Sequence, residues 1–147
     1  MEISLAAPED IPELIELLAQ LFAQETEFQP DTEAQRRGLA RIIANPEIGS
    51  ILVGRREGVA VGMVNLLYTV STALGEPVAV LEDLVVSLRM RGAGLGSHLL
   101  EAAVEHARSR GCKRITLLTD RDNEAAQHFY LRHGFYLSGM VPMRLLL

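Results

Sequence analysis

The chain has 147 residues, of which 48% are hydrophobic and 22% are charged, and its formal net charge is −5. This length suits one domain with a single core, and the apolar content excludes a long disordered protein. We therefore expect residues 1–147 to form a single domain. The negative charge disfavours nucleic acid as the main partner and mildly favours a cationic substrate.

The sequence predicts a cytoplasmic protein that does not bind membranes. Pro8, Glu9 and Asp10 interrupt the first apolar residues, so no secretory signal is visible, and no apolar run approaches the roughly 20 residues of a membrane span. Cys112 is the only cysteine, which rules out a disulfide within the chain, and we predict a structural role for it. None of the four histidines pairs with a carboxylate at a metal-ligand spacing, so no metal site is predicted.

The first half of the chain reads as a strand, two helices and a hairpin. Residues 2–7 are expected to form a strand, and Asp10 with Glu13 resembles a capping box. The helix that follows shows apolar residues at helical spacing: Ile11, Leu14, Ile15, Leu18, Leu21 and Phe22. A second helix is expected from about residue 30 to residue 45, because Pro46 stops it. Two strands over residues 50–56 and 59–72 should then pair antiparallel through a tight turn at Glu57 and Gly58.

The second half alternates strands with helices. Residues 78–87 are apolar except for Glu82 and Asp83, which predicts a central strand covered on both faces. A helix should run from Leu95 to Gly111, a strand over residues 113–119, and a short helix from Asn123 to Gly134. Residues 135–147 are expected to add one or two final strands. The fold class is therefore α/β (α+β) with a mixed sheet, in the order β-α-α-β-β-β-α-β-α-β.

A glycine-rich turn connects the buried strand directly to the following helix. Gly92, Gly94 and Gly96 let the backbone approach a ligand closely, and the free N–H groups of a helix N-terminus favour phosphate oxygens. A P-loop would need a lysine after Gly96, and the spacing GxGxG, late in the chain, disfavours a dinucleotide-binding Rossmann turn. The turn predicts a ligand that carries a pyrophosphate. A turn that only packs the helix closely is the structural alternative.

Two segments resemble the GNAT superfamily of N-acetyltransferases. Residues 91–96 read Arg-x-x-Gly-x-Gly, like its acetyl-CoA signature, and residues 123–135 are similar to its N-x-x-A-x-x-F-Y-x-x-x-G-F segment. The predicted element order is also that of the GNAT acyl-CoA N-acyltransferase fold, so the resemblance covers the whole chain. It implies an enzyme that transfers the acetyl group of acetyl-CoA, its co-substrate, to a primary amine. The amine would attack directly in a ternary complex, without a covalent intermediate.

The same resemblance implies roles for single residues. The backbones of Leu84 and Val86 would pair with the pantetheine arm of acetyl-CoA, and Asn123 would hydrogen-bond to it, although Asn123 equally suits a plain helix cap. Tyr130 matches the general acid that contacts the co-substrate and protonates the departing thiolate, with a core aromatic beside Phe129 as the alternative. The residues that would surround the pyrophosphate are Arg91, Gly92, Ala93, Gly94, Gly96 and Ser97.

A base is also needed, because an alkylammonium group with a pKa of about 10.4 has no lone pair at neutral pH. Strand alternation places Glu82 on the same face as Leu84 and Val86, so Glu82 is the predicted base, or else a structural hydrogen-bond acceptor. Asp83 points the other way unless a bulge intervenes, and is the reserve candidate. A carboxyl group in an apolar strand should have a raised pKa, which suits proton transfer.

Two other classes stay open at this point. One is a catalytically degenerate acyl-CoA-binding sensor or subunit of the same fold, which the presence of Glu82 and Tyr130 disfavours. The other is an unrelated nucleotide-binding α/β protein, which the antiparallel front half disfavours. Small polyamines, amino sugars, amino acids and protein N-termini remain possible acceptors. Specificity is expected to reside in residues 22–31 and 69–76, where a cationic amine would meet Glu25, Glu27 and Phe28.

The C-terminus predicts a homodimer. It ends in Leu145, Leu146 and Leu147, whereas chain ends are usually polar. An alternating strand buries only one face against its own domain, so some of these leucines need a second cover. We expect pairing of C-terminal strands between two copies, with cover by helices of the same subunit as the alternative.

Overall fold

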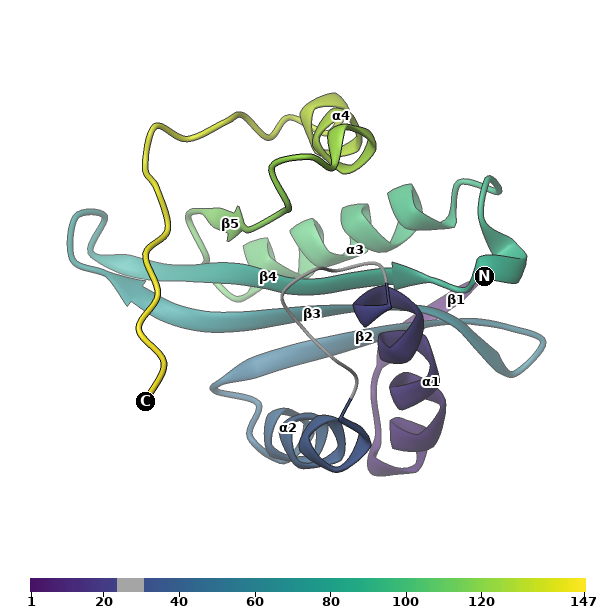
Figure 1. Cartoon of the computed structure of the whole chain (residues 1–147). Coiled ribbons are helices and arrows are strands. Elements are labelled where there is room, and N and C mark those ends of the chain that lie inside the picture. Colours follow the sequence, from purple (N-terminus) through teal and green to yellow (C-terminus); the bar gives the residue numbers. More distant parts are fainter. Residues whose placement is uncertain (24–30) are drawn as a thin grey trace.

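The structure, a computed structural model, describes residues 1–23 and 31–147. Five strands form one sheet in the order β1-β2-β3-β4-β5 (Figure 1). Strands β1 to β4 pair antiparallel, and β5 pairs parallel with β4. The hairpin of β2 with β3 and the mixed sheet are as the sequence predicts. The strands are β1 Glu2–Leu5, β2 Gly49–Arg56, β3 Val59–Ser71, β4 Glu76–Val86 and β5 Ile115–Leu117. The helices are η1 Pro8–Asp10, α1 Ile11–Phe22, α2 Thr32–Ala44, η2 Leu88–Met90, α3 Leu95–Ser109 and α4 Glu124–Arg132.

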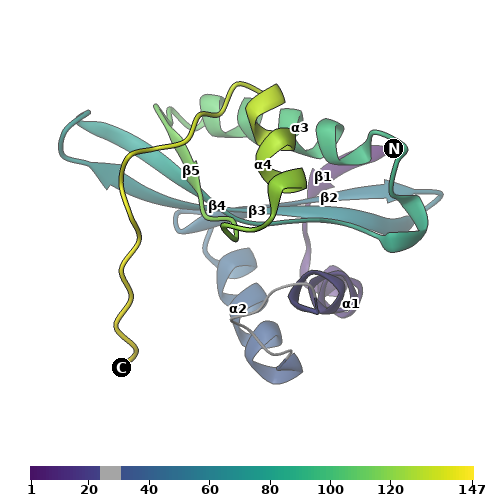
Figure 2. The same cartoon turned by 45° about the horizontal axis from the view of Figure 1, so that its top comes forward.

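Helices cover both faces of the sheet (Figure 2). Alternate residues of the central strands supply two apolar clusters, because successive side chains of a strand point to opposite faces. Ile51, Val53 and Met63 join the cluster under α1 and α2, whereas Leu52 and Val64 join the cluster under α3. The two-sided burial confirms the central position predicted for β4. In the described ranges, no helix is long and apolar enough to cross a membrane.

The predicted turn at Glu57 and Gly58 and the predicted cap at Asn123 are confirmed, and the structure adds a cap at Asp31. Glu57 and Gly58, between β2 and β3, have φ values of 53° and 78°, as a tight hairpin turn requires. The side-chain oxygens of Asp31 and Asn123 each accept a hydrogen bond, at 3.1 Å, from the backbone N–H three residues ahead. These caps fix the starts of α2 and α4.

The predicted capping box at Asp10 and Glu13 is wrong. Asp10 makes no side-chain cap to α1; its carboxylate accepts from the Ala7 N–H at 2.7 Å and forms an ion pair with Arg55 of β2. Glu13 instead accepts from the Ala60 N–H at 2.9 Å. Both carboxylates thereby attach the start of α1 to the sheet, because the sheet offers them donors that a helix end alone does not.

The C-terminal segment also differs from its prediction, since residues 135–147 form no strand. They leave α4 as an extended segment that passes the β3–β4 hairpin and ends on the α2 side of the sheet (Figure 1; Figure 2). The segment has the apolar composition of a strand, but a strand needs a partner, and within the described residues no other strand pairs with it. Its large apolar side chains are between 72% and 116% exposed: Tyr136, Leu137, Met140, Val141, Met143, Leu145, Leu146 and Leu147.

A β-bulge interrupts β4 at Glu82. Asp83 lies opposite Asn65 of β3, and Leu81 lies opposite Leu66, so Glu82 has no partner on β3. Leu81 packs toward α3, and after the bulge Leu84 and Val86 pack toward α3 as well. A regular strand would place Leu81 and Leu84 on opposite faces, because they are three residues apart. The alternation that placed Glu82 on the face of Leu84 is broken at this point. Asp83 and Val85 consequently face α1 and α2.

Candidate functional site

Strands β4 and β5 pair over only three residues of each strand and then separate. Their parallel pairing runs from Ala79 with Ile115 to Leu81 with Leu117, whereas β4 continues to Val86. Past Leu81, the side of β4 that faces away from β3 has no strand beside it among the described residues. The result is an open strand edge in the middle of the sheet.

The open edge displays the backbone groups of Leu84 and Val86. The Ser87 N–H donates to the Val61 carbonyl of β3 at 2.8 Å, and main-chain groups alternate between the two sides of a strand. The N–H and C=O groups of Leu84 and Val86 therefore point away from β3. On that side the Arg91 side chain donates from Nε to the Val86 carbonyl oxygen at 3.4 Å. The family resemblance implies that the pantetheine arm of acetyl-CoA pairs with these same backbone groups.

The glycine turn lies at the end of this edge. Gly92 and Gly94 have φ values of 86° and 77°, which side-chain-bearing residues rarely adopt, and a Cβ at either would meet nothing within 4 Å. Gly96 serves packing instead, because a Cβ there would lie 3.6 Å from Phe129 and 3.8 Å from Val86. The turn therefore has features of both alternatives predicted from the sequence. Gly92 and Gly94 border open space, as a ligand-binding turn requires, and Gly96 allows close packing of the helix.

The N-terminus of α3 faces the turn without a side-chain cap. Gly94 is the N-cap, and the first bond along the helix is from the His98 N–H to the Gly94 carbonyl oxygen at 3.3 Å. The N–H groups of Leu95, Gly96 and Ser97 lie in the first turn, where no preceding helical carbonyl is available to accept their hydrogen bonds. A helix of 15 residues with uncapped donors and an open glycine backbone fits a pyrophosphate.

Helix α4 places an aromatic cluster above the open edge. Tyr130 packs edge-to-face on Phe129 and on Phe135, with ring centroids 5.2 Å and 5.5 Å apart, and all three lie against the apolar cluster that includes Leu84 and Val86. Burial raises the pKa of Tyr130 to about 12, so the phenol stays protonated over the physiological range. Tyr130 therefore packs against the core and keeps its phenolic proton.

On the opposite face of β4, Asp83 is paired with an asparagine that the sequence analysis did not select. Asn65 is 4% exposed and donates from Nδ2 to Asp83 Oδ2 at 3.1 Å, whereas its Oδ1 is buried and has no hydrogen-bond partner among the described residues. Burial, reinforced by the charge of Glu82 and opposed by this hydrogen bond, raises the pKa of Asp83 from 3.8 to about 6. The sequence signal for Asn65 was a single amide side chain within the apolar run of residues 63–67. Glu82 itself is exposed.

The remaining predicted positions contribute less to this site. Glu25, Glu27 and Phe28 lie outside the described residues. Cys112 is half-buried, and burial raises the pKa of its thiol, as expected for a structural cysteine. In the part of the chain that the structure describes, no group of three or more His, Cys, Asp or Glu side chains could hold a metal ion.

Comparisons with known proteins agree with this geometry. The model of the acetyltransferase (GNAT) family matches residues 12–135. An aminoalkylphosphonate N-acetyltransferase of Salmonella typhimurium is 32% identical over 134 residues, which are 91% of this chain and 84% of that protein. An acetyltransferase of Trypanosoma brucei superposes with a TM-score of 0.75 and 29% identity over 99% of both chains. An aminoglycoside N-acetyltransferase solved with CoA shares the fold, with a TM-score of 0.82 and 18% identity over 99% of this chain and 93% of that one.

The five-stranded mixed sheet with helices on both faces is the mixed α/β fold of GNAT acetyltransferase structures. The chain belongs to the GNAT acetyltransferase family, whose members use acetyl-CoA. It is an acetyltransferase, and both the family resemblance and the fold class predicted from the sequence are confirmed.

Asp83→Asn is expected to stabilise the protein at neutral pH. The pKa of Asp83 is about 6 in the folded protein and 3.8 without burial. The folded state therefore holds a proton that the unfolded chain has already lost, so stability falls as the pH rises through this window. The two values correspond to about 3 kcal/mol at most. An amide avoids this penalty and can still accept the Asn65 hydrogen bond.

The measurement is the free energy of unfolding in urea at pH 7.5 and at pH 4. We expect the variant to gain about 1–3 kcal/mol at pH 7.5 and almost nothing at pH 4, where Asp83 is protonated in the wild-type protein. A variant that is equally destabilised at both pH values would contradict a buried, ionised carboxylate at this position.

Proposed function

We propose that this protein transfers the acetyl group of acetyl-CoA to a primary amine of a small molecule or peptide, by direct attack in a ternary complex. The observation that carries the proposal is the continuity of the site: β4 loses its neighbour after Leu81, and its open edge leads into the glycine turn. A pantetheine arm can add to this edge as a strand would, while its pyrophosphate lies against α3. The proposed contacts to acetyl-CoA are Leu84, Val86, Arg91, Gly92, Ala93, Gly94, Gly96, Ser97, Asn123 and Tyr130.

In the proposed reaction the chain binds and orients acetyl-CoA and moves protons. A backbone N–H of Leu84 or Val86 would stabilise the negative charge that develops on the thioester oxygen as the amine attacks. Tyr130 would donate its phenolic proton to the CoA thiolate as the carbon–sulfur bond breaks. An acidic residue of β4 would accept the proton that the ammonium group must lose. The sequence predicts Glu82 for this step with Asp83 in reserve, but the bulge removes the strand alternation on which the choice of Glu82 depended.

A catalytically degenerate sensor of the same fold is not favoured, because the Salmonella relative, which aligns with 91% of this chain, is named as an N-acetyltransferase. For the acceptor we propose a small primary alkylamine. The name of the Salmonella relative makes aminoalkylphosphonates the first compounds to test. The net charge of −5 is consistent with an acceptor whose reacting end is cationic.

Gly94→Glu is expected to abolish binding of CoA. Its φ of 77° strains any side chain, and a carboxylate at the helix N-terminus would repel phosphate. Thermal shift measures the effect, because a ligand that binds only the native state raises the melting temperature. The matched control is Gly75→Glu in the β3–β4 hairpin, where φ is 67° and a Cβ also meets nothing within 4 Å. Should the folded Gly94 variant still bind CoA tightly, the pyrophosphate does not lie in this turn.

Tyr130→Phe is expected to leave the affinity for acetyl-CoA intact while turnover falls about 10²- to 10⁴-fold, the usual range for loss of a positioned proton donor. Because the pKa of Tyr130 is about 12, the loss should be uniform between about pH 6 and pH 9. Release of CoA thiol reports turnover. Tyr136→Phe, at a residue that is 84% exposed, serves as the control. Near-wild-type turnover in the Tyr130 variant would leave this residue with only its packing role.

We further propose a homodimer formed through the C-terminal segment. Eight large apolar side chains of residues 136–147 are exposed, and β5 is the last strand of the sheet, with one edge open. Such groups need a cover that a second copy can supply. Sedimentation at micromolar concentration should give a dimer, and deletion of Leu145–Leu147 should give a monomer that still melts cooperatively. A monomeric full-length chain would contradict the proposal.

A further inference from the structure

A cavity lies beside α1, apart from the contacts proposed for acetyl-CoA. It has a volume of about 340 Å³ and is lined by residues of α1, of the first part of β3 and of the segment that follows β4. Sites for small molecules commonly have volumes of about 300–1,000 Å³. None of the residues proposed above to contact acetyl-CoA lines the cavity, and neither Asn65 nor Asp83 does. The cavity is therefore large enough for a small ligand of its own.

Two side chains of α1 connect the walls of this cavity. Glu13 accepts a hydrogen bond from the Ala60 N–H of β3 at 2.9 Å. Gln20, seven residues further along the same face of the helix, accepts with Oε1 from the Leu88 N–H of η2, also at 2.9 Å. Both of these side chains line the cavity. Helix α1 therefore bridges the start of β3 and η2, and the cavity is a built feature of the fold.

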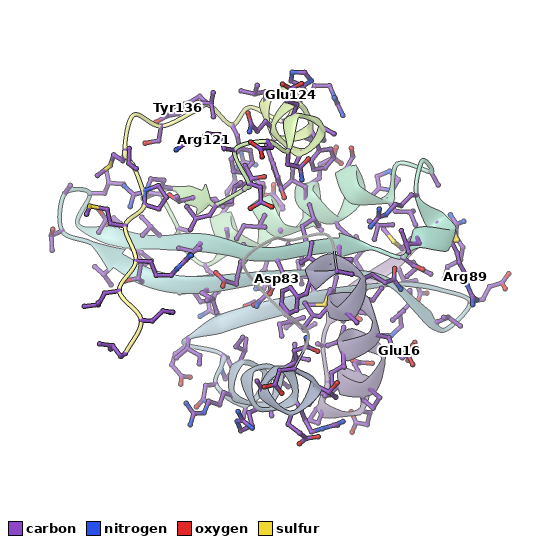
Figure 3. The ribbon with its side chains drawn as sticks, in the orientation of Figure 1. Glu16, Asp83, Arg89, Arg121, Glu124 and Tyr136 are labelled. Atoms are coloured by element: carbon purple, nitrogen blue, oxygen red, sulfur yellow. The ribbon has the colours of Figure 1, made fainter. Side chains whose placement is uncertain are left out.

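Two opposite charges line the cavity without meeting each other. Glu16 of α1 and Arg89 of η2 lie on the same side of the molecule (Figure 3), and both line the cavity. Within residues 1–23 and 31–147, neither side chain takes part in an ion pair or a hydrogen bond. Gln20 uses its Oε1 for Leu88, which leaves the two donors of Nε2 for a ligand. The charged groups of the cavity are therefore available for binding.

The order of the lining residues selects the ligand. The carboxylates of Glu13 and Glu16 come from the first half of α1, whereas the donors of Gln20 and Arg89 lie at the η2 end. Apolar residues also line the cavity: Leu17, Val59, Val61 and Met90. A guanidinium group binds a carboxylate through two parallel hydrogen bonds, and a carboxylate binds an ammonium group. A ligand with a single charge would cover the opposite charge of the cavity without pairing it, so the matching ligand carries both charges, joined by a hydrocarbon chain.

The cavity adjoins the segment that leads into the glycine turn. Helix η2 ends at Met90, and the turn begins with the next residue, Arg91. The Met90 N–H donates to the Ser87 carbonyl oxygen at 2.9 Å, and the Leu88 N–H donates to Gln20. A ligand bound to the η2 end of the cavity adds a further attachment to this segment. A segment that one ligand has already ordered costs less conformational entropy when a second ligand binds next to it.

We propose that this cavity is an effector site for a linear amino acid, whose ammonium group binds at Glu16 and whose carboxylate binds at Arg89, and that its occupancy strengthens the binding of CoA. The ligand class is an ammonium group and a carboxylate at opposite ends of a short hydrocarbon chain. The amino-acid site does not depend on the proposed acetyl transfer. Its effect on CoA rests on the proposed position of the pyrophosphate in the glycine turn, and thermodynamic linkage makes that effect reciprocal.

Calorimetry of the full-length protein without CoA tests the ligand class. The probes are 4-aminobutyrate, 6-aminohexanoate and 8-aminooctanoate, which differ in the spacing of the same two charges. Hexylamine and hexanoate should bind about tenfold more weakly than the best of these amino acids, because each lacks one charge-assisted interaction. Absence of binding by all three amino acids, or equal binding of hexylamine or hexanoate, would overturn the site.

Single amide substitutions test the two charged groups. Glu16→Gln and Arg89→Gln should each weaken binding of the best probe about tenfold or more, because each removes one charge partner. Both residues are exposed, so we expect the variants to fold. The matched controls are Glu101→Gln on α3 and Arg37→Gln on α2, which are exposed and do not line the cavity. Wild-type affinity in both cavity variants would contradict the proposed contacts.

The effect on CoA is measured as a linkage between the two sites. A saturating concentration of the best probe should lower the Kd of CoA about fivefold or more, and saturating CoA should lower the Kd of the probe by the same factor. The Gly94→Glu variant, which should lose CoA, is expected to bind the probe with wild-type affinity. Binding of the probe with an unchanged Kd of CoA would overturn the effector role. A wild-type protein that binds no CoA would instead contradict the proposed function, and calorimetry with the amino acids alone would still test the cavity.

Discussion

The single constraint on which the site depends is the register of β4. The strand is held by β3 along its whole length but by β5 for only three residue pairs, and the bulge at Glu82 lies just where the second pairing ends. Beyond that point the described residues place no strand beside β4 on the β5 side. The bulge also reverses which face of the sheet each following side chain occupies. The same short stretch therefore exposes main-chain groups along its edge and turns the Asp83 carboxylate toward α1 and Asn65.

The bulge also has an energetic reason in the sequence. Glu82 and Asp83 are consecutive acidic residues in a strand with helices on both faces. In a regular strand they would point to opposite faces, and each carboxylate would meet an apolar cluster, where burying an unpaired charge is costly. Adding one unpaired residue lets Glu82 reach solvent and leaves only Asp83 inside, next to Asn65. Two adjacent charges inside a buried strand are thus themselves a signal for a bulge.

Sequence reasoning succeeds here where the determinants are local. The spacing of leucines along α3, the cap at Asn123, and the turn at Glu57 and Gly58 are each specified by a few neighbouring residues. Sequence reasoning fails where the conformation or hydrogen bonding of a residue depends on a partner that is distant in the chain. The apolar residues 135–147 have the composition of a strand but find no strand to pair with, and the carboxylates predicted to cap α1 bind the sheet instead.

The candidate site divides in the same way. The glycine turn and the Asn123 and Tyr130 segment are contiguous motifs, so the sequence identified them, whereas Asn65 lies 18 residues from Asp83 and becomes visible only through cross-strand register. Its position in the core is unfavourable for the free protein: a buried carboxylate and an amide oxygen without a donor both weaken folding. Sites that violate the rules of a well-packed core are where function is expected, because a ligand can supply what the fold leaves out.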